Sequence, residues 1–293
     1  MEITPSHASS VILVRDTPQG VETFLVKRHL ASRFMGGLYA FPGGKVEISD
    51  STDQLLDCVE GLSGDASQDG LGAGVYPGVA EIYWIAAMRE VFEEVGVLFA
   101  HDAAGNPLRF DDRKKQQRFE RYRGLLFRKE ASFTQLLQQE HLRLMIPELL
   151  YYEHWITPVA RSIRYDTHFF LAEIPVGQAP SIDYQEINEG IWQRLAVAMK
   201  ENTRGIRPLT PPALCMLYGL QSFSSVRTIK EFCMTKQISE PIVPVLTTID
   251  GQETILLPGD ALYTEHGGET AMHENTLPQL LRLVLKEGRW LPA

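Results

Sequence analysis

Alternating apolar and polar positions near the N-terminus predict two β-strands joined by a tight turn. Residues 9–15 (SSVILVR) and 22–29 (ETFLVKRH) are rich in strand-forming residues, and Thr17-Pro18-Gln19-Gly20 between them has turn chemistry, so we expect a hairpin. Further strands are expected at residues 152–157, 166–174 and 186–192, and the stretch 241–293 alternates Val, Leu and Ile with Gly and Pro turns, which is typical of β structure.

A helical period replaces this alternation in residues 80–95. At about 100° per residue, one face collects the apolar side chains of Ile85, Met88, Phe92 and Val95. Gly96 follows as a natural helix end. Similar patterns predict helices at residues 112–128, 133–142, 193–201, 213–223 and 224–235, and a short one at 53–60.

The mixture of strands and helices predicts an α/β fold of the α+β type. The chain has 293 residues, which is more than the roughly 100–200 residues of a typical domain. We expect one domain at residues 1–205, enlarged by insertions at about 51–81 and 106–147. Residues 206–293 would form a C-terminal extension, first helical and then β-rich, packed on the same domain.

Composition narrows the class of protein. Hydrophobic residues make up 44% and charged residues 22%, which excludes global disorder. An apolar run of about 18 residues is missing, so we expect no membrane span, and the N-terminus lacks the pattern of a secretory signal. The three cysteines are widely spaced, which favours a reducing, cytoplasmic setting. The net charge of −9 argues against a nucleic-acid partner.

One segment departs from this acidic average. Residues 113–129 carry a single acid, Glu120, among eight basic residues: Arg113, Lys114, Lys115, Arg118, Arg121, Arg123, Arg128 and Lys129. The segment could form a rim that attracts a polyanionic ligand, or it could be the solvated face of an inserted helix.

Three carboxylates recur at helical spacing on the predicted helix 80–95. Glu90, Glu93 and Glu94 stand at i, i+3 and i+4, so they share one face and repel each other. A divalent cation would relieve this repulsion, and hard oxygen ligands suit Mg²⁺ or Mn²⁺. Arg89 could pair with one of the acids. The alternative is a solvated acidic helix face.

Together with their neighbours, these residues resemble the signature of the Nudix hydrolases, G-x5-E-x7-R-E-U-x-E-E-x-G-U, in which U is a bulky aliphatic residue. Gly44 of the sequence FPGG matches the first glycine, and residues 89–97 match the second half at every specified position. Two departures stand out. Asp50 occupies the first Glu position, and 38 residues (51–88) replace the seven-residue spacer. Glu47 is an alternative partner for Arg89 if Asp50 lies too far away.

A split signature with Asp at this position resembles the peroxisomal and mitochondrial-type coenzyme A diphosphatase branch. Arg33 and Gly37 followed by FPGG fit a spacing of coenzyme A-cleaving relatives, and the stretches WITP at 155–158 and RYDT at 164–167 also look similar to this branch. The resemblance implies a Nudix αβα sandwich with a mixed sheet. It also implies cleavage of coenzyme A or acyl-coenzyme A to phosphopantetheine and a bisphosphorylated adenosine.

The resemblance also implies roles for individual residues. Glu90, Glu93, Glu94 and the Gly43 carbonyl would hold the metal, and Arg89 would orient the acids by pairing with Asp50. Glu90 is the first candidate for the general base, with Glu186 as its competitor, although Glu186 could equally be a surface acid. Gly44 and Gly96 would be structural. Candidates for phosphate contact are Arg28, Arg33 and Arg164.

Two alternatives remain open at this point. The chain could hydrolyse another dinucleotide, such as NADH or ADP-ribose, or it could be a non-catalytic Nudix-fold regulator that binds a ligand. In each case we expect a small phosphorylated molecule as the partner, with neither nucleic acid nor membrane. The C-terminal extension could shield the site, mediate a homodimer or extend the sheet. The eight histidines show no metal-ligand spacing, so no role is assigned to them.

Overall fold

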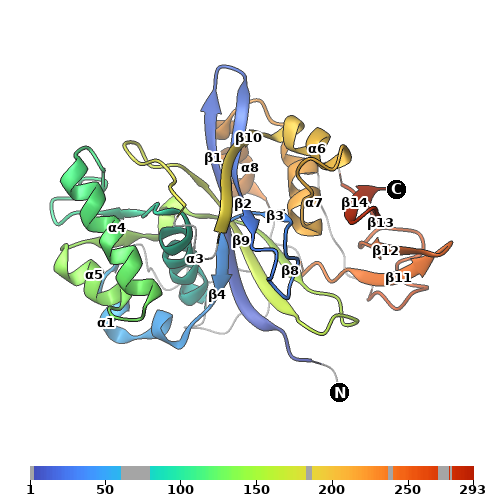
Figure 1. Ribbon diagram of the computed structural model, residues 1–293, viewed down its shortest axis with the longest axis horizontal. Helices are drawn as coiled ribbons and strands as arrows, with labels where there is room; N and C mark the ends of the chain where they lie inside the picture. Colours follow the sequence, from blue (N-terminus) through green and yellow to red (C-terminus); the bar gives the residue numbers. More distant parts are fainter. Residues whose placement is uncertain (1–2, 61–79, 183–186, 237–239, 270–276, 278) are drawn as a thin grey trace.

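A mixed β-sheet forms the centre of the molecule (Figure 1). The computed structural model describes residues 3–60, 80–182, 187–236, 240–269, 277 and 279–293. The main sheet has the order β10-β2-β1-β9-β8, with β3 paired to β2 and β4 paired to β1. Strands β1 and β9 are parallel and the other pairs are antiparallel. The strands are β1 Ser6–Thr17, β2 Gly20–Arg28, β3 Tyr39–Ala40, β4 Gly43–Lys45, β8 Leu150–Ile156, β9 Tyr165–Glu173 and β10 Ile187–Arg194.

Both faces of this sheet are covered, because its central strands are apolar on both sides. Val11 and Leu13 of β1 point into one core cluster, whereas Ile12 and Val14 point into the other, as the two-residue period of a strand requires. Helix α3 (Ala80–Val95) packs on the first face; α6 (Leu195–Thr203), α7 (Pro211–Leu220) and α8 (Val226–Thr235) pack on the second. The expected αβα sandwich with a mixed sheet is confirmed.

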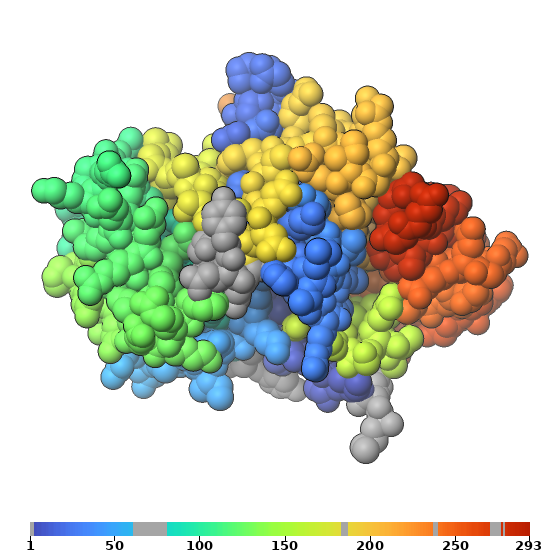
Figure 2. Space-filling view, in the orientation of Figure 1, coloured from blue at the N-terminus to red at the C-terminus, as the bar shows by residue number. Residues whose placement is uncertain are grey.

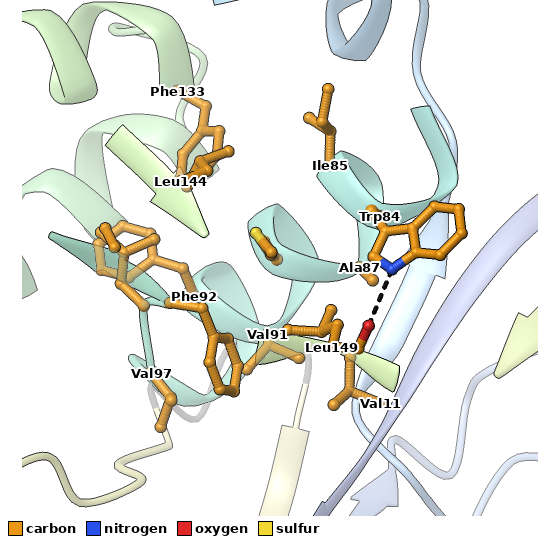
Figure 3. Packing of buried hydrophobic residues seen from close by; sticks show 14 of the residues in the cluster. Val11, Trp84, Ile85, Ala87, Val91, Phe92, Val97, Phe133, Leu144 and Leu149 are labelled. Atoms are coloured by element: carbon orange, nitrogen blue, oxygen red, sulfur yellow. Dashed lines mark hydrogen bonds between the residues drawn. The ribbon is translucent and has the colours of Figure 1, made fainter. Parts of the chain in front are cut away.

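Helix α3 begins and ends where the apolar period predicts. Its expected apolar face is completely buried, together with neighbouring side chains such as Trp84 and Val91. Figure 3 shows Ile85, Val91 and Phe92 of this face. It also shows Trp84, whose indole donates a hydrogen bond of 3.0 Å to the Leu149 carbonyl oxygen. The helix is thereby fixed against the sheet, and its remaining face is available for the acidic residues.

The predicted insertion at 106–147 contains helices α4 (Arg113–Phe127) and α5 (Phe133–Gln139). The expected helix at 53–60 is shorter, because α1 covers only Asp53–Leu56 and Val59–Glu60 forms strand β5. Strand β5 joins β7 (Arg143–Met145) and β6 (Ala100–His101) in a small sheet that the sequence analysis missed. Strands of two or three residues show no measurable period. The chain also forms two short 3₁₀ helices, η1 (Ile48–Ser51) and η2 (Ile146–Glu148).

The C-terminal residues form an antiparallel sheet, as their composition predicts. Its strands are β11 Val245–Ile249, β12 Gln252–Leu256, β13 Arg282–Lys286 and β14 Arg289–Pro292. This sheet shares a core cluster with α6 and α7 and lies beside them on the surface (Figure 2). The amide of Asn202 in α6 donates a hydrogen bond of 2.9 Å to the Trp290 carbonyl. The cysteines are free, and no helix within the described ranges has the length and apolar character needed to cross a membrane.

Candidate active site

The three carboxylates of α3 lie beside the glycine pair of β4. Gly44 is in such close contact with Glu90 that a Cβ atom at position 44 would lie 2.5 Å from the carboxyl carbon. Since real contacts of this kind do not occur, only glycine lets strand and carboxylate approach so closely. The backbone N–H of Gly43 donates a hydrogen bond of 2.9 Å to Glu94. Two of the three acids are therefore held directly against β4.

Gly43 is itself required by the backbone. Its φ is +152°, and a Cβ atom there would lie 2.2 Å from the carbonyl oxygen of Ser9 in β1. Gly43 pairs with Ser10 in the sheet, so β1 sets the position of the glycine pair. The expected use of the Gly43 carbonyl as a metal ligand stays a prediction.

Arg89 organises the acidic face from its buried side. Nε and Nη2 donate to the two carboxylate oxygens of Asp50 at 2.7 and 3.0 Å, and Nη2 also donates to the Lys45 carbonyl at 2.8 Å. Nη1 donates to Glu90 at 3.0 Å and to Glu93 at 3.3 Å. These bonds use the five N–H groups of the guanidinium, which is thus locked in one orientation.

Asp50 occupies the place that the resemblance assigned to it, despite the long spacer that follows. Its side chain is completely buried and that of Arg89 is only 5% exposed, so the pair is shielded from water. The backbone N–H of Glu47 donates to Asp50 at 2.8 Å, which holds the second carboxylate oxygen. The alternative pairing of Arg89 with Glu47 is therefore not needed.

Burial changes the acid–base properties of this face. It raises the pKa of the Glu90 carboxyl to about 7; Arg89 opposes this rise and the charge of Glu93 adds to it. Burial alone would lower the pKa of Arg89, but the hydrogen bonds to Asp50 and the charge of Glu90 raise it above its usual value. Arg89 stays charged at neutral pH, whereas Glu90 is poised between its two protonation states.

Helix α4 supports the end of α3. Arg123 is buried, and its Nη2 donates to the carbonyls of Glu93 and Glu94 at 3.1 and 2.8 Å. A cation at this position is favourable because carbonyl groups at a helix C-terminus carry partial negative charge. Gly96 ends the helix with φ of +72°, and a Cβ atom there would lie 3.1 Å from the Arg123 guanidinium.

Other basic residues of the segment 113–129 have surface partners. Arg118 pairs with Glu140 at 2.8 Å and Arg128 pairs with Glu130 at 3.1 Å, each with about half of its side chain exposed. These two match the interpretation as a solvated helix face. Lys129 lines a cavity of about 640 Å³ that Glu93 also lines.

A cavity of about 520 Å³ lies beside the glycine pair and two of the acids. Its polar end is lined by Gly43, Gly44, Lys45, Glu90 and Glu94. Its other wall is apolar and comes partly from the C-terminal residues, with Trp155, Phe169, Pro211, Pro244 and Ile255. A ligand with a charged group at one end and an apolar arm at the other matches this distribution.

The predicted arginines differ in their relation to this cavity. Arg28 lines it, and its Nε donates to the Phe34 carbonyl at 3.1 Å. Arg33 is exposed and does not belong to the described lining. Arg164 is buried and donates to the carbonyls of Ile3 and Thr157, a position that does not fit the expected phosphate contact.

One residue of the cavity escaped the sequence analysis, and one predicted residue lies outside the described ranges. Arg161 lines the cavity and pairs with Glu253 of β12 at 2.7 Å. Its only sequence cue is its place in the loop before β9, three residues ahead of Arg164. Glu186, the competing candidate for the general base, lies outside the described residues.

Comparisons with known proteins agree with this geometry. The family model described as the NUDT19 Nudix domain matches residues 67–220, just over half of the chain. The acyl-coenzyme A diphosphatase NUDT19 of Xenopus laevis is 26% identical over 92% of this chain and 79% of its own length. The putative nudix hydrolase 7 of Caenorhabditis elegans is 28% identical over 94% and 77%, respectively.

Among solved structures, a NUDIX hydrolase from Alicyclobacillus acidocaldarius matches with a TM-score of 0.62 and 20% identity. The match covers 81% of this chain and 99% of the other, so it extends beyond the signature to most of the fold. The fold, the glycine pair beside the acidic helix and the family model lead to one assignment. The chain belongs to the NUDT19 Nudix domain family of the Nudix hydrolases.

Proposed function

We propose that this protein is a metal-dependent diphosphatase that cleaves the diphosphate of coenzyme A or acyl-coenzyme A. The observation that carries the proposal is the cavity, which joins the Glu90 and Glu94 carboxylates to an apolar wall. The relatives from Xenopus laevis, Gallus gallus and Homo sapiens, named acyl-coenzyme A diphosphatase NUDT19, support the same substrate class. The products would be phosphopantetheine, acylated or free, and 3′,5′-bisphosphorylated adenosine.

A divalent cation is the cofactor that Nudix hydrolases generally use, and we propose Mg²⁺ or Mn²⁺. The donor set fits, because Glu90, Glu93 and Glu94 offer only hard carboxylate oxygens. Burial raises the pKa of Glu90 although the Arg89 cation lies beside it. A further positive charge at this face would therefore stabilise the ionised carboxylate. When bound, such a cation neutralises the charge of the diphosphate and lowers the pKa of a bound water.

The residues of this chain would position the reaction. Arg89 is a positioning residue, since Asp50 fixes its guanidinium and the guanidinium then bonds to Glu90 and Glu93. Water attacks one phosphorus, a new P–O bond forms, and the bond to the bridging oxygen breaks, so that the other phosphate leaves. Glu90 is the first candidate to accept the proton of the water, because it lies on the face that would hold the cation.

The cavity suggests how the substrate lies. Lys45, Arg28 and Arg161 line it and can contact phosphate oxygens, while the pantetheine arm follows the apolar wall toward Ile255. The alternative substrates NADH and ADP-ribose have no acyl chain that could lie along that wall. A non-catalytic regulator would have no use for the network of hydrogen bonds that orients the acids. We propose a small phosphorylated partner rather than nucleic acid, and a cytoplasmic location, which suits the free cysteines.

A substrate panel tests this function directly. Coenzyme A, acyl-coenzyme A, NADH and ADP-ribose are assayed side by side with Mg²⁺ or Mn²⁺, and the products are identified. We expect coenzyme A or its acyl derivatives to give the highest kcat/KM. Preferential hydrolysis of NADH or ADP-ribose would replace the proposed substrate, and an absence of turnover with all four would favour the regulator.

Variants of the acids test the site itself. We expect Glu93→Gln and Glu94→Gln to fold normally and to lose more than about 100-fold in turnover, since a lost metal ligand removes several kcal/mol of transition-state stabilisation. Glu120→Gln, on the exposed surface of α4, is the matched control. Wild-type rates in both site variants would exclude the assigned metal site.

A further inference from the structure

Three histidines gather around one aspartate on the α3 side of the main sheet. His154 of β8 lies opposite His168 of β9, and His7 of β1 lies opposite Asp166 of β9. Because Asp166 and His168 are two residues apart in a strand, they point to the same face. Tyr83, near the start of α3, covers the group, with its ring 4.0 Å from that of His168.

The distances show that Asp166 is the centre of this cluster. Its Oδ1 lies 2.5 Å from Nε2 of His154 and 3.8 Å from Nε2 of His168. Its Oδ2 lies 3.8 Å from Nδ1 of His7, which also contacts the Tyr83 hydroxyl at 2.7 Å. The rings of His154 and His168 stack with centroids 4.0 Å apart.

The neighbours of His168 do not account for a buried imidazole at this position. Its side chain is 2% exposed, and its Nδ1 has no hydrogen-bond partner among the described residues. A buried polar atom without a partner destabilises the fold, so such an atom requires an explanation. Beyond Ser9, which pairs with His168, this face continues into the apolar core through Val11 and Phe170, where an aliphatic residue would fill the space without this cost.

We propose that His154, Asp166 and His168 bind a divalent transition-metal ion such as Zn²⁺, with His7 as an additional ligand at the edge. Their ligand atoms all lie within 4.8 Å of one another. Imidazole nitrogens suit Zn²⁺, Co²⁺ and Ni²⁺, unlike the all-carboxylate set on α3. The site is therefore chemically distinct from the one that we propose for Mg²⁺ or Mn²⁺.

Binding requires a small rearrangement. Ligand atoms on an ion with bonds of about 2.1 Å lie roughly 3.0–3.4 Å apart. The contact between Asp166 and His154 must therefore open and the contact with His168 must close. The two rings must also leave their stack, because each nitrogen lone pair lies in the plane of its ring. His154 is the ring that turns, since it is less buried than His168.

The position of the site indicates a structural role. Tyr83 lies seven residues before Glu90 on α3, which is about 10 Å along the helix axis. None of the cluster residues belongs to the described lining of the cavity beside the glycine pair. An ion here would join β1, β8 and β9 beneath the start of the helix that carries the acids. His7, with 60% of its side chain exposed, leaves the site accessible from solvent.

Metal binding is best measured in a protein that lacks the other site. In the Glu93→Gln/Glu94→Gln double variant, Co²⁺ is titrated at neutral pH and followed by its visible absorption, and Zn²⁺ is then added as a competitor. We expect one equivalent of Co²⁺ to bind and Zn²⁺ to displace it. Absence of a saturable equivalent in this folded background overturns the proposal, whatever the activity of the wild-type protein.

Single substitutions in that background locate the ion. We expect His154→Ala and Asp166→Asn to weaken Co²⁺ binding by about tenfold or more, since even groups that only orient a ligand contribute about 10–100-fold. His266→Ala, an exposed histidine on the C-terminal side, is the control. Unchanged affinity in the first two variants, or equal loss in the control, refutes the assignment.

A measurement without cluster substitutions guards against misfolding of those variants. Paramagnetic Co²⁺ broadens the imidazole proton resonances of the histidines that bind it. We expect the resonances of His154 and His168 to broaden first, at substoichiometric Co²⁺, while those of His266 remain sharp. Uniform broadening of all histidines, or none, means that the cluster is a metal-free arrangement of hydrogen-bonded and stacked rings.

Discussion

Replacing Asp50 with Asn removes the charge that holds Arg89 while it preserves the shape of the side chain. Asp50 accepts two hydrogen bonds from the Arg89 guanidinium and one from the backbone N–H of Glu47. Asn offers one acceptor oxygen, and its NH₂ group would have to face a donor. At least one buried N–H therefore loses its partner, and the Arg89 cation loses its closest counter-charge.

The expected cost follows from the burial of the pair. Asp50 is completely buried and the side chain of Arg89 is 5% exposed, so water cannot replace the lost interaction. Removing one partner of a buried ion pair costs about 3–5 kcal/mol. Glu90 and Glu93 still face Arg89 and supply part of the missing charge, which favours the lower end, about 3 kcal/mol or roughly a 100-fold change in the folding equilibrium.

Function should suffer as well, because Arg89 is what orients two of the acids. A loosened guanidinium no longer fixes Glu90 and Glu93, and loss of such an orienting contact typically weakens metal binding about 10–100-fold. Urea unfolding gives the free energy, and calorimetric titration of the folded variant with Mn²⁺ gives the affinity. Asp53→Asn, an exposed acid three residues away, controls for the loss of one negative charge.

The outcome that would refute this reasoning is clear. If Asp50→Asn stays within about 0.5 kcal/mol of the wild type, like an ordinary surface substitution, the pair does not stabilise the fold. If its Mn²⁺ affinity is also unchanged, Arg89 does not orient the acids. Asp50→Glu restores the residue of the family signature but adds a methylene to an enclosed site, so we expect a loss of about 1–3 kcal/mol rather than a gain.

Four further predictions concern the glycine pair, proton release, the pH dependence of stability and the apolar wall. Gly44→Ala should abolish metal-dependent turnover with little unfolding, because the new methyl group displaces the Glu90 carboxylate; retained turnover in a rate assay would contradict this. Mn²⁺ binding at about pH 6 should release close to one proton, because Glu90 with a pKa of about 7 is then protonated. This proton release should vanish about two pH units higher, and calorimetry in two buffers of different ionisation enthalpy measures it. The same raised pKa means that the metal-free fold loses stability as pH rises from about 4.5 to 7, since only the folded state holds this proton. Ile255→Ala should raise KM for long-chain acyl-coenzyme A more than for coenzyme A, and equal changes in steady-state assays would place the acyl chain elsewhere.

Local patterns in the sequence predicted the acidic helix and its neighbours well. Helix α3 was predicted at its full length because its apolar period is regular and Gly96 ends it. The helix expected at residues 53–60 proved shorter, and the small sheet of β5, β7 and β6 was missed, since two-residue strands carry no period and depend on tertiary pairing. The cluster around Asp166 was invisible for a related reason. Its histidines come from three strands, and only the register of the sheet brings them together.

The basic residues of the segment 113–129 have different structural roles. The sequence alone is compatible with a rim that attracts a ligand and with a solvated helix face. Arg118 and Arg128 match the solvated face. Arg123 matches neither, because it is buried and donates to the carbonyl groups of Glu93 and Glu94. The C-terminal end of α3 combines the negative end of the helix dipole with a cluster of carboxylates, so a fixed cation there lowers the repulsion that the acids would otherwise meet before any metal binds. The segment 113–129 therefore also stabilises the C-terminal end of the helix that carries the three acids.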